Sequence, residues 1–251
     1  MRTVFNVTGL LFLLVVSGCA SKVEREGVDS EKAAVANTEL GVAYLAKGKY
    51  KVAMGKLKKA LAFDENNVNA HHYIAELYRR LEQNDLADRH FKIAMELDNE
   101  DSSIKNNYGI FLCGTSSYKK GLKLLNEALL DPLYSDKGQA YENMGLCAEK
   151  QGNIRNAENF YNTALTFKKD LPAALLGLAQ IEFDKKNIQS AASYFDRYTK
   201  IAQHTAQSLW LGVLIERKKG RGGLSGSYAL KLKRNFPDSK EAKLLKKLNI
   251  R

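Results

Sequence analysis

Histidine and cysteine are the side chains in this sequence best suited to chemistry, and they are few. The 251 residues contain four histidines and three cysteines. His72 and Glu76 are four residues apart, so on a helix they would share one face and could both contact a metal ion. A zinc site needs three or four protein ligands. Because this pair supplies only two, we predict no metal site and expect His72 to be a hydrogen-bonded histidine in a groove.

The sequence contains no motif typical of an enzyme. It has no glycine-rich phosphate loop, no nucleophile elbow and no paired catalytic carboxylates. Its aromatic residues recur at a spacing typical of a packed helical core. We therefore expect a protein without catalytic activity and without a cofactor, whose function is to bind other proteins.

The protein is basic, with a formal net charge of +11 at pH 7. Such a charge can favour nucleic acid, an anionic membrane surface or an acidic protein partner. The lysines are dispersed and often stand near acidic residues, and the densest basic stretches are residues 217–221 and 231–234. We interpret this pattern as a solvated surface and predict no binding to nucleic acid.

The first residues have the layout of a secretory signal. Met1 and Arg2 precede an apolar run at residues 10–16, which is too short to span a bilayer as a helix. Val16-Ser17-Gly18-Cys19 resembles the lipobox of bacterial lipoproteins, in which the cysteine is acylated and becomes the new N-terminus. A cysteine placed there by chance is the alternative. We predict a signal peptide at residues 1–18, lipid attachment at Cys19 and a polar, lipidated tether at residues 19–33.

A residue pattern recurs along the chain with a period of 34, except that two extra residues enter at residues 131–137. A large residue followed by a small one stands at 40–41, 74–75, 108–109, 144–145 and 178–179, and more weakly at 211–212. Each pair is followed by a second set of three residues. These sets are Ala53, Leu57, Ala60; Ala87, Phe91, Ala94; Gly121, Leu125, Ala128; Ala157, Tyr161, Ala164; Ala191, Phe195, Tyr198; and Leu224, Tyr228, Lys231. The spacing resembles the tetratricopeptide repeat, in which small residues let two helices of a hairpin approach closely.

These repeats predict an all-α fold, a right-handed superhelical solenoid of about six helical hairpins. Since a single hairpin cannot bury its own apolar face, the units must stack on one another. We place them at residues 34–67, 68–101, 102–135, 138–171, 172–204 and 205–238, with a C-terminal cap helix at residues 239–251. The sixth unit departs most from the pattern, because it has Lys231 where the other units mostly have alanine.

The first helix of each hairpin is expected to line a groove that binds a partner. The repeat phase places seven residues there: Asn69, His72, Glu76, Asn106, Ile110, Glu142 and Leu146. Plain exposure to solvent is the alternative for each of them.

Cys113 and Cys147 are also one repeat apart, in the first helices of the third and fourth units. These helices lie side by side in such a stack, so the two thiols could meet. An exported protein reaches an oxidising compartment, which permits a disulfide. Two buried free thiols that act as small apolar groups are the alternative.

The third unit contains the run Asn106-Asn107-Tyr108-Gly109-Ile110-Phe111-Leu112-Cys113. This run is similar to the Asn-Asn-Tyr-Gly-x-Phe-Leu-Cys motif of the pilotin family of type IV pilus biogenesis. Asn143-Met144-Gly145-Leu146-Cys147 and Phe236-Pro237-Asp238-Ser239 also resemble that family. The lipobox, the repeat number and these motifs together span the chain.

The resemblance implies an outer-membrane lipoprotein that faces the periplasm and has six tetratricopeptide repeats. Such proteins bind secretin subunits and help them to reach the outer membrane and form a multimer. The resemblance also implies a disulfide between Cys113 and Cys147. In lipoproteins of this kind a residue other than aspartate after the cysteine, here Ala20, implies sorting to the outer membrane. We expect the protein to be monomeric by itself.

Two other functions fit the same architecture. The protein could be a different lipid-anchored scaffold, such as an accessory of β-barrel assembly or an adaptor for a peptidoglycan enzyme. It could also be a periplasmic enzyme on a repeat scaffold, which would need a catalytic constellation that the sequence lacks.

Overall fold

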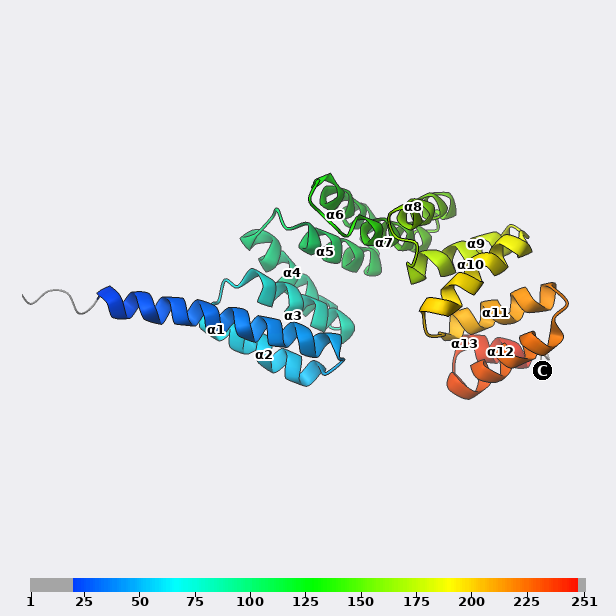
Figure 1. Cartoon of the computed structure of the whole chain (residues 1–251), viewed down its shortest axis with the longest axis horizontal. Coiled ribbons are helices and arrows are strands. Elements are labelled where there is room, and N and C mark those ends of the chain that lie inside the picture. The colour runs from blue at the N-terminus through cyan, green and yellow to red at the C-terminus, as the bar shows by residue number, and fades with distance from the viewer. Residues whose placement is uncertain (1–19, 248–251) are drawn as a thin grey trace, which may run out of the picture. The chain divides into compact units, whose positions relative to one another are not determined.

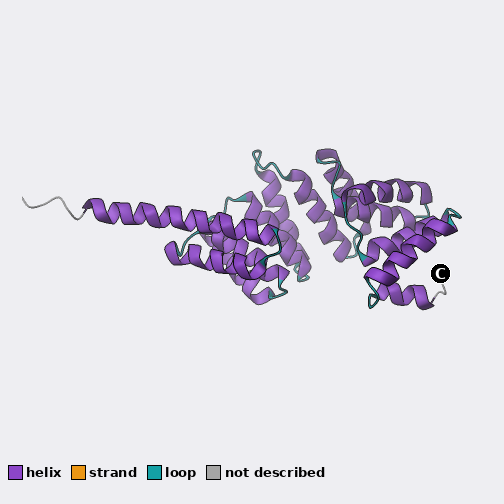
Figure 2. Ribbon diagram, turned by 60° about the horizontal axis from the view of Figure 1, so that its bottom comes forward, coloured by secondary structure: helices purple, strands orange, loops and turns teal. Residues whose placement is uncertain are grey.

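The computed structural model describes residues 20–247, and within this range every regular element is a helix (Figure 1, Figure 2). Twelve of the thirteen helices form six consecutive hairpins, and α13 (Lys240–Lys247) follows the last one. The hairpins are α1 (Ala20–Ala46) and α2 (Tyr50–Phe63), α3 (Val68–Arg80) and α4 (Asn84–Leu97), α5 (Ser102–Gly114) and α6 (Tyr118–Leu130), α7 (Lys137–Lys150) and α8 (Ile154–Phe167), α9 (Pro172–Asp184) and α10 (Ile188–Ile201), and α11 (Ala206–Lys218) and α12 (Gly222–Asn235). The all-α tetratricopeptide class is thereby confirmed.

The N-terminal part differs from our expectation of a tether. The predicted signal peptide at residues 1–18 and the predicted lipid-attachment residue Cys19 lie outside the described residues. From Ala20, however, the backbone is helical, and α1 continues for 27 residues to Ala46. Residues 20–33 contain no proline and are rich in Ala, Lys, Glu and Arg, which favour helix even where no apolar face directs it. None of the helices in the described range is long and apolar enough to cross a membrane.

The chain divides into two compact units, residues 1–93 and 94–251, and each is described by itself. In the first unit, α2 buries Ala53, Leu57 and Ala60. Ala53 and Leu57 pack with Leu45 and with Ile74 and Leu77 of α3 in one apolar cluster. Gly41 of α1 permits this packing, since a Cβ atom at that position would lie 2.6 Å from Cγ of Leu57. The small residue of the repeat pattern therefore brings the two helices of the first hairpin together.

In the second unit the repeat pattern acts in the same way around Tyr161. This residue of α8 is fully buried, and its hydroxyl group donates a hydrogen bond to Glu149 at 2.6 Å. A Cβ atom added at either Gly145 of α7 or Gly177 of α9 would clash with the tyrosine ring. Tyr161 thus fills a space that two glycines leave open, one in its own hairpin and one in the next.

The sixth hairpin corrects our assignment of its repeat positions. We assigned Leu224, Tyr228 and Lys231 to the three repeat positions, whereas α12 buries Ser225, Ala229 and Leu232, and Tyr228 is half-buried against the core. Leu224 is 50% exposed, and Lys231 is exposed as well. The buried set lies 34 residues after Ala191, Phe195 and Tyr198, so the period is unbroken. The Leu211-Gly212 pair mimics the large-small pattern one residue too early, which shifted our phase.

Candidate partner-binding site

A groove lies between α1 and α3 in the first unit. It has a volume of about 430 Å³ and combines apolar and polar side chains. Its lining consists of Val35, Thr38, Glu39, Val42, Ala43, Asn67, Asn69 and Tyr73. Val35 is 47% exposed, so the groove presents an apolar side chain to solvent. A surface of this kind suits an apolar segment of another protein with some hydrogen-bonding groups.

The sequence of α1 directs one face of the helix toward this groove. Val35, Thr38 and Val42 are three and four residues apart, so they follow one another along that face. Asn67 fixes the position of α3 beside it. The Asn67 side-chain oxygen accepts a hydrogen bond from the backbone N–H of Ala70 at 2.9 Å and so caps α3. The same oxygen lies 3.3 Å from the hydroxyl oxygen of the buried Thr38, which joins the start of α3 to α1.

A second hydrogen bond joins α1 to the end of α3. Arg80, at the end of α3, donates a hydrogen bond from a guanidinium nitrogen to the backbone oxygen of Leu45 at 3.1 Å. Side-chain hydrogen bonds therefore join α1 to both the start and the end of α3. The site is preformed, so a partner would not have to order it.

The seven residues that we predicted to line the groove differ widely in exposure. Asn69 is exposed and lines the groove described above, while Ile110 and Leu146 are half-buried. The other four, His72, Glu76, Asn106 and Glu142, are buried. Contact of these four with a partner is therefore not supported by their positions. The repeat phase assigned these residues to one side of each helix, but it did not indicate how deeply neighbouring side chains cover that side.

Residues of α1 are missing from our prediction, although a signal for them exists. Thr38 lies 34 residues before His72 and 68 before Asn106, so it occupies the same repeat position. Val42 is related in the same way to Glu76 and Ile110. Extending the repeat phase backward into the first unit would have identified both residues.

The buried polar residues of the second unit connect consecutive hairpins. The Asn143 side chain on α7 donates a hydrogen bond to the side-chain oxygen of Asn106 on α5 at 3.0 Å. Glu142 accepts a hydrogen bond from the backbone N–H of Ala174 at 2.9 Å and another from Gln139 at 2.6 Å. These groups satisfy one another inside the protein, which explains why they can be buried. Asn106 and Glu142 therefore have a structural role here.

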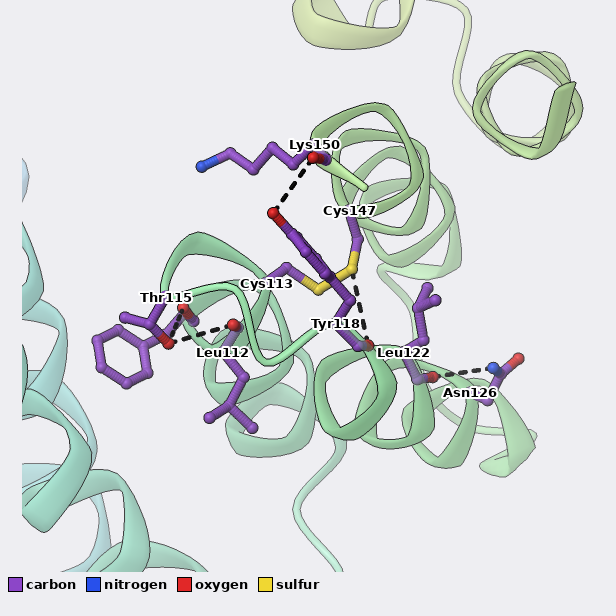
Figure 3. Close-up of a disulfide and its surroundings, with 9 residues drawn as sticks. Leu112, Cys113, Thr115, Tyr118, Leu122, Asn126, Cys147 and Lys150 are labelled. Carbon is purple, nitrogen blue, oxygen red and sulfur yellow. Dashed lines mark hydrogen bonds between the residues drawn. A yellow bond between two sulfur atoms is a disulfide. The ribbon is translucent and has the colours of Figure 1, made fainter. Parts of the chain in front are cut away.

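The cysteines of the third and fourth hairpins form a disulfide, shown in Figure 3. The Cα atoms of Cys113 and Cys147 are 5.2 Å apart, and both residues are buried. Tyr118 of α6 lies beside the bridge and donates a hydrogen bond from its hydroxyl group to the backbone oxygen of Lys150 at 3.2 Å (Figure 3). The alternative of two free thiols does not describe this structure.

The family-like run around Cys113 is mostly part of the core. Tyr108, Gly109, Phe111 and Leu112 are buried, and Asn107 is half-buried and accepts a hydrogen bond from Asn106 at 3.1 Å. A Cβ atom at Gly109 would lie 2.8 Å from Cγ of Leu125. Packing between α5, α6 and α7 therefore constrains the run, whether or not a partner also contacts it.

A pair of titratable histidines lies in the first unit. The Nδ1 atoms of His71 and His90 are 2.9 Å apart, and Nε2 of His71 lies 3.0 Å from the backbone oxygen of Glu65. Burial and, next, the positive charge of His71 lower the pKa of His90 to about 4. One ring must donate to the other, so at least one of the two is neutral near pH 7. Across residues 20–247, no three His, Cys, Asp or Glu side chains come close enough to hold a metal ion.

Comparison with known proteins shows which family has both this fold and these motifs. A family model of the tetratricopeptide repeat matches residues 145–205. The solved structure of PilW, a widely conserved type IV pilus biogenesis factor, is 30% identical, has a TM-score of 0.72 and covers 84% of this chain and 97% of its own. The chain belongs to the PilF/PilW family of type IV pilus biogenesis proteins. The resemblance seen in the sequence is thereby confirmed.

Two further comparisons extend this result. The type IV pilus assembly protein PilF of Pseudomonas aeruginosa is 29% identical over 92% of this chain and 94% of its own length. A solved structure of P. aeruginosa PilF is 28% identical, has a TM-score of 0.75 and covers 87% of this chain and 98% of its own. The PilF/PilW likeness therefore extends over nearly the whole repeat array, beyond the residues matched by the repeat model.

Proposed function

We propose that this protein is a type IV pilus pilotin, a lipid-anchored protein that binds secretin subunits and promotes their assembly in the outer membrane. The observation that supports this most strongly is the coverage of PilF and PilW, which this chain matches over more than nine-tenths of their lengths. The lipobox-like sequence at Cys19 supplies the anchor in this proposal, and acyl chains of that kind give stable membrane attachment. The protein faces the periplasm and acts without catalysis.

The groove between α1 and α3 is the proposed site for the secretin. Its apolar residues, Val35 and Val42, would contact apolar side chains of the bound segment. Its polar residues Asn67 and Asn69 would supply hydrogen bonds to the backbone of that segment.

The helix that forms the groove also connects it to the predicted anchor. From Ala20 to Val35, α1 rises about 22 Å at 1.5 Å per residue. The bound secretin segment would therefore be held at a set distance along α1 from the lipidated residue. Because the helix that lines the groove begins at the residue after the predicted anchor, a subunit bound in the groove would be carried wherever the acyl chains insert.

Substitution in the groove tests this proposal. The double variant Val35→Glu and Val42→Glu places two carboxylates among the apolar groups of the site, which should be strongly unfavourable for an apolar ligand. We expect about a tenfold loss of secretin co-purification from detergent-solubilised envelopes, with a matching loss of secretin multimers from the outer membrane.

A matched control is Val52→Glu, since Val52 is 43% exposed on α2 in the same unit but does not line the groove. It should leave co-purification unchanged. A folded groove variant that retains full secretin binding would exclude the groove, and a deletion strain with intact secretin multimers in the outer membrane would refute the pilotin function. Co-purification with β-barrel assembly proteins or wall enzymes instead of secretin would indicate a different scaffold.

A further inference from the structure

The positive charge of this protein is concentrated at one end of the chain. Residues 205–251 contain 12 basic and 3 acidic side chains, a net charge of +9. The remaining 204 residues contain 27 basic and 25 acidic side chains, so they are nearly neutral. The overall charge of +11 is therefore a property of the last hairpin and the helix after it. Our interpretation of a generally solvated basic surface did not capture this asymmetry.

The structure places these basic residues on the outside of a well-packed end of the second unit. Leu209 and Val213 of α11, Ala229 and Leu232 of α12, and Ala242 and Leu245 of α13 form one buried apolar cluster. Around this cluster the cations occupy residues 217–221, residues 231–234 and α13. Nine of the eleven basic side chains in residues 205–247 are exposed, and Lys219 and Lys233 are half-buried. We call this set of eleven side chains the C-terminal basic surface.

Stabilisation of helix ends explains only part of this arrangement. Cations in the last turn of a helix interact favourably with its dipole, and α11, α12 and α13 each have two basic residues there. Lys231 and Lys243 lie outside those last turns and add to the same positive field, as does Lys240, whose charge is partly offset by Glu241 at 3.7 Å. Exposed like charges repel one another, so the cluster lowers stability unless a partner compensates it.

One carboxylate is already bound at the edge of this surface. Glu216 is only 5% exposed, and its two oxygens lie 3.7 Å from Nζ of Lys219 and 3.7 Å from a guanidinium nitrogen of Arg221. The carboxylate thus forms ion pairs with a lysine and an arginine at distances too long for hydrogen bonds, and its buried Oε2 has no hydrogen-bond partner. A planar guanidinium group suits carboxylates in particular, and Arg217, Arg221 and Arg234 are all exposed.

Exposed leucines lie among the cations. Leu230 of α12 is 71% exposed, and Leu224 and Leu244 are 50% and 39% exposed. They are spread over two helices, so they do not form the single apolar stripe of a helix that lies in a membrane interface. Trp210 and Tyr228, the aromatic residues in this region that could anchor at such an interface, are half-buried and pack on the apolar cluster. Separate leucines beside cations suit an acidic polypeptide with interspersed apolar residues better than a bilayer.

We propose that the C-terminal basic surface is a second docking site, which binds an acidic, leucine-containing segment of a protein partner. It is distinct from the groove between α1 and α3, which has one acidic lining residue and no basic one. Complementary charge gives such a site fast association and specificity for acidic partners. The inference does not depend on the groove or on the secretin.

Peptide binding to the full chain in neutral detergent tests this inference. The probe is a fluorescein-labelled peptide of repeated Glu-Glu-Leu triplets, and its reference is the corresponding Gln-Gln-Leu peptide. We expect the acidic peptide to bind at least tenfold more tightly, and its binding to weaken about tenfold between low and moderate salt. Fluorescence anisotropy measures both effects.

Two variants with the same change in charge separate this surface from net charge alone. The first replaces five exposed cations of the C-terminal basic surface: Lys231→Gln, Arg234→Gln, Lys243→Gln, Lys246→Gln and Lys247→Gln. The second replaces five exposed lysines elsewhere in the second unit: Lys119→Gln, Lys120→Gln, Lys168→Gln, Lys186→Gln and Lys200→Gln. We expect about a tenfold loss of acidic-peptide affinity in the first variant and less than a twofold loss in the second.

Equal losses in the two variants would overturn the inference, because the effect would then come from net charge. Equal affinity for the Glu and Gln peptides would overturn it as well. Binding to mixed micelles that contain phosphatidylglycerol, without binding to the acidic peptide, would assign the surface to the membrane and refute the proposal. Circular dichroism on each variant shows whether it is folded. If the variant with five substitutions does not fold, the double variant Lys246→Gln and Lys247→Gln replaces it.

Discussion

Glu142 of α7 caps the first helix of the next repeat, since its carboxylate accepts a hydrogen bond from the backbone N–H of Ala174 at 2.9 Å. Helix α9 has Leu171 at its N-cap position, and this side chain cannot accept a hydrogen bond. Glu142 of α7 therefore takes the place of the missing cap, and its negative charge also lies near the positive end of the α9 dipole. A residue that we expected to contact a partner thus orders the stack.

Removal of this carboxylate should destabilise the second unit. We expect Glu142→Ala to lower the free energy of unfolding by about 1–3 kcal/mol, because a buried backbone N–H loses its partner. Glu142→Gln keeps an oxygen that can accept the same hydrogen bond, so it should lose less. Urea unfolding followed by circular dichroism measures both, and equal stability of the Ala and Gln variants would contradict the capping role.

Two glycine substitutions should have opposite effects. At Gly145 a Cβ atom would clash with the Tyr161 ring, so we expect Gly145→Ala to cost about 1–3 kcal/mol of stability. At Gly55, inside α2, a Cβ atom meets nothing within 4 Å. There Gly→Ala should stabilise the helix by about 0.5–1 kcal/mol, because alanine has the higher helix propensity. Thermal melts of both variants test this, and the same sign of change at the two sites would refute the packing account.

The disulfide predicts a stability that depends on redox conditions. The chain-entropy model gives up to about 4 kcal/mol for the loop that Cys113 and Cys147 close. We expect the reduced protein and the double variant Cys113→Ala and Cys147→Ala to unfold at similarly lower urea concentrations. Mass spectrometry after thiol labelling establishes the oxidised state of the native protein. Unchanged stability on reduction would show that the bridge adds nothing beyond packing.

The His71–His90 pair predicts a loss of stability in acid. Burial and, next, the positive charges of His71, Arg89 and Lys58 together lower the pKa of His90 from 6.5 to about 4. Between pH 4 and pH 6.5, His90 is protonated in the unfolded chain but neutral in the folded chain. The free energy of unfolding should therefore fall as the pH is lowered from 6.5 toward 4. The stabilisation that depends on a neutral His90 should be fully present above pH 6.5.

Comparison with His90→Asn isolates this effect. In that variant the slope of unfolding free energy against pH should be shallower over the same range, since the group that titrates is gone. Urea titrations at several pH values give the two slopes. Identical slopes would show that other groups control the acid response.

The sequence predicted the repeat fold well because packing imposes it. Small residues such as Gly145 and Gly177 must stand opposite large ones such as Tyr161, and this requirement recurs in the sequence at a fixed spacing. The same rule failed in the sixth hairpin, where Leu211-Gly212 imitates the pattern one residue early. The polar start of α1 was also misjudged, because a solvated helix and a flexible tether can have the same composition.

The candidate site was harder to predict than the fold. Repeat phase gave the side of the helix for Glu142 and Asn106, but their burial depends on hydrogen bonds to Ala174 and Asn143 in neighbouring hairpins. Such partners come from residues more than 30 positions away, and no local pattern marks them. The charge asymmetry of the last hairpin, in contrast, could have been counted from the sequence alone.

The position of Tyr161 between Gly145 and Gly177 has a consequence for how the second unit opens. Its ring belongs to α8, but it is covered by helices of two successive hairpins. If the hairpin of α9 and α10 unfolded alone, it would expose one face of this ring to water and leave the Gly145 side covered. That cost discourages separate opening of single repeats, so the fourth and fifth hairpins should exchange their amide hydrogens as one cooperative block.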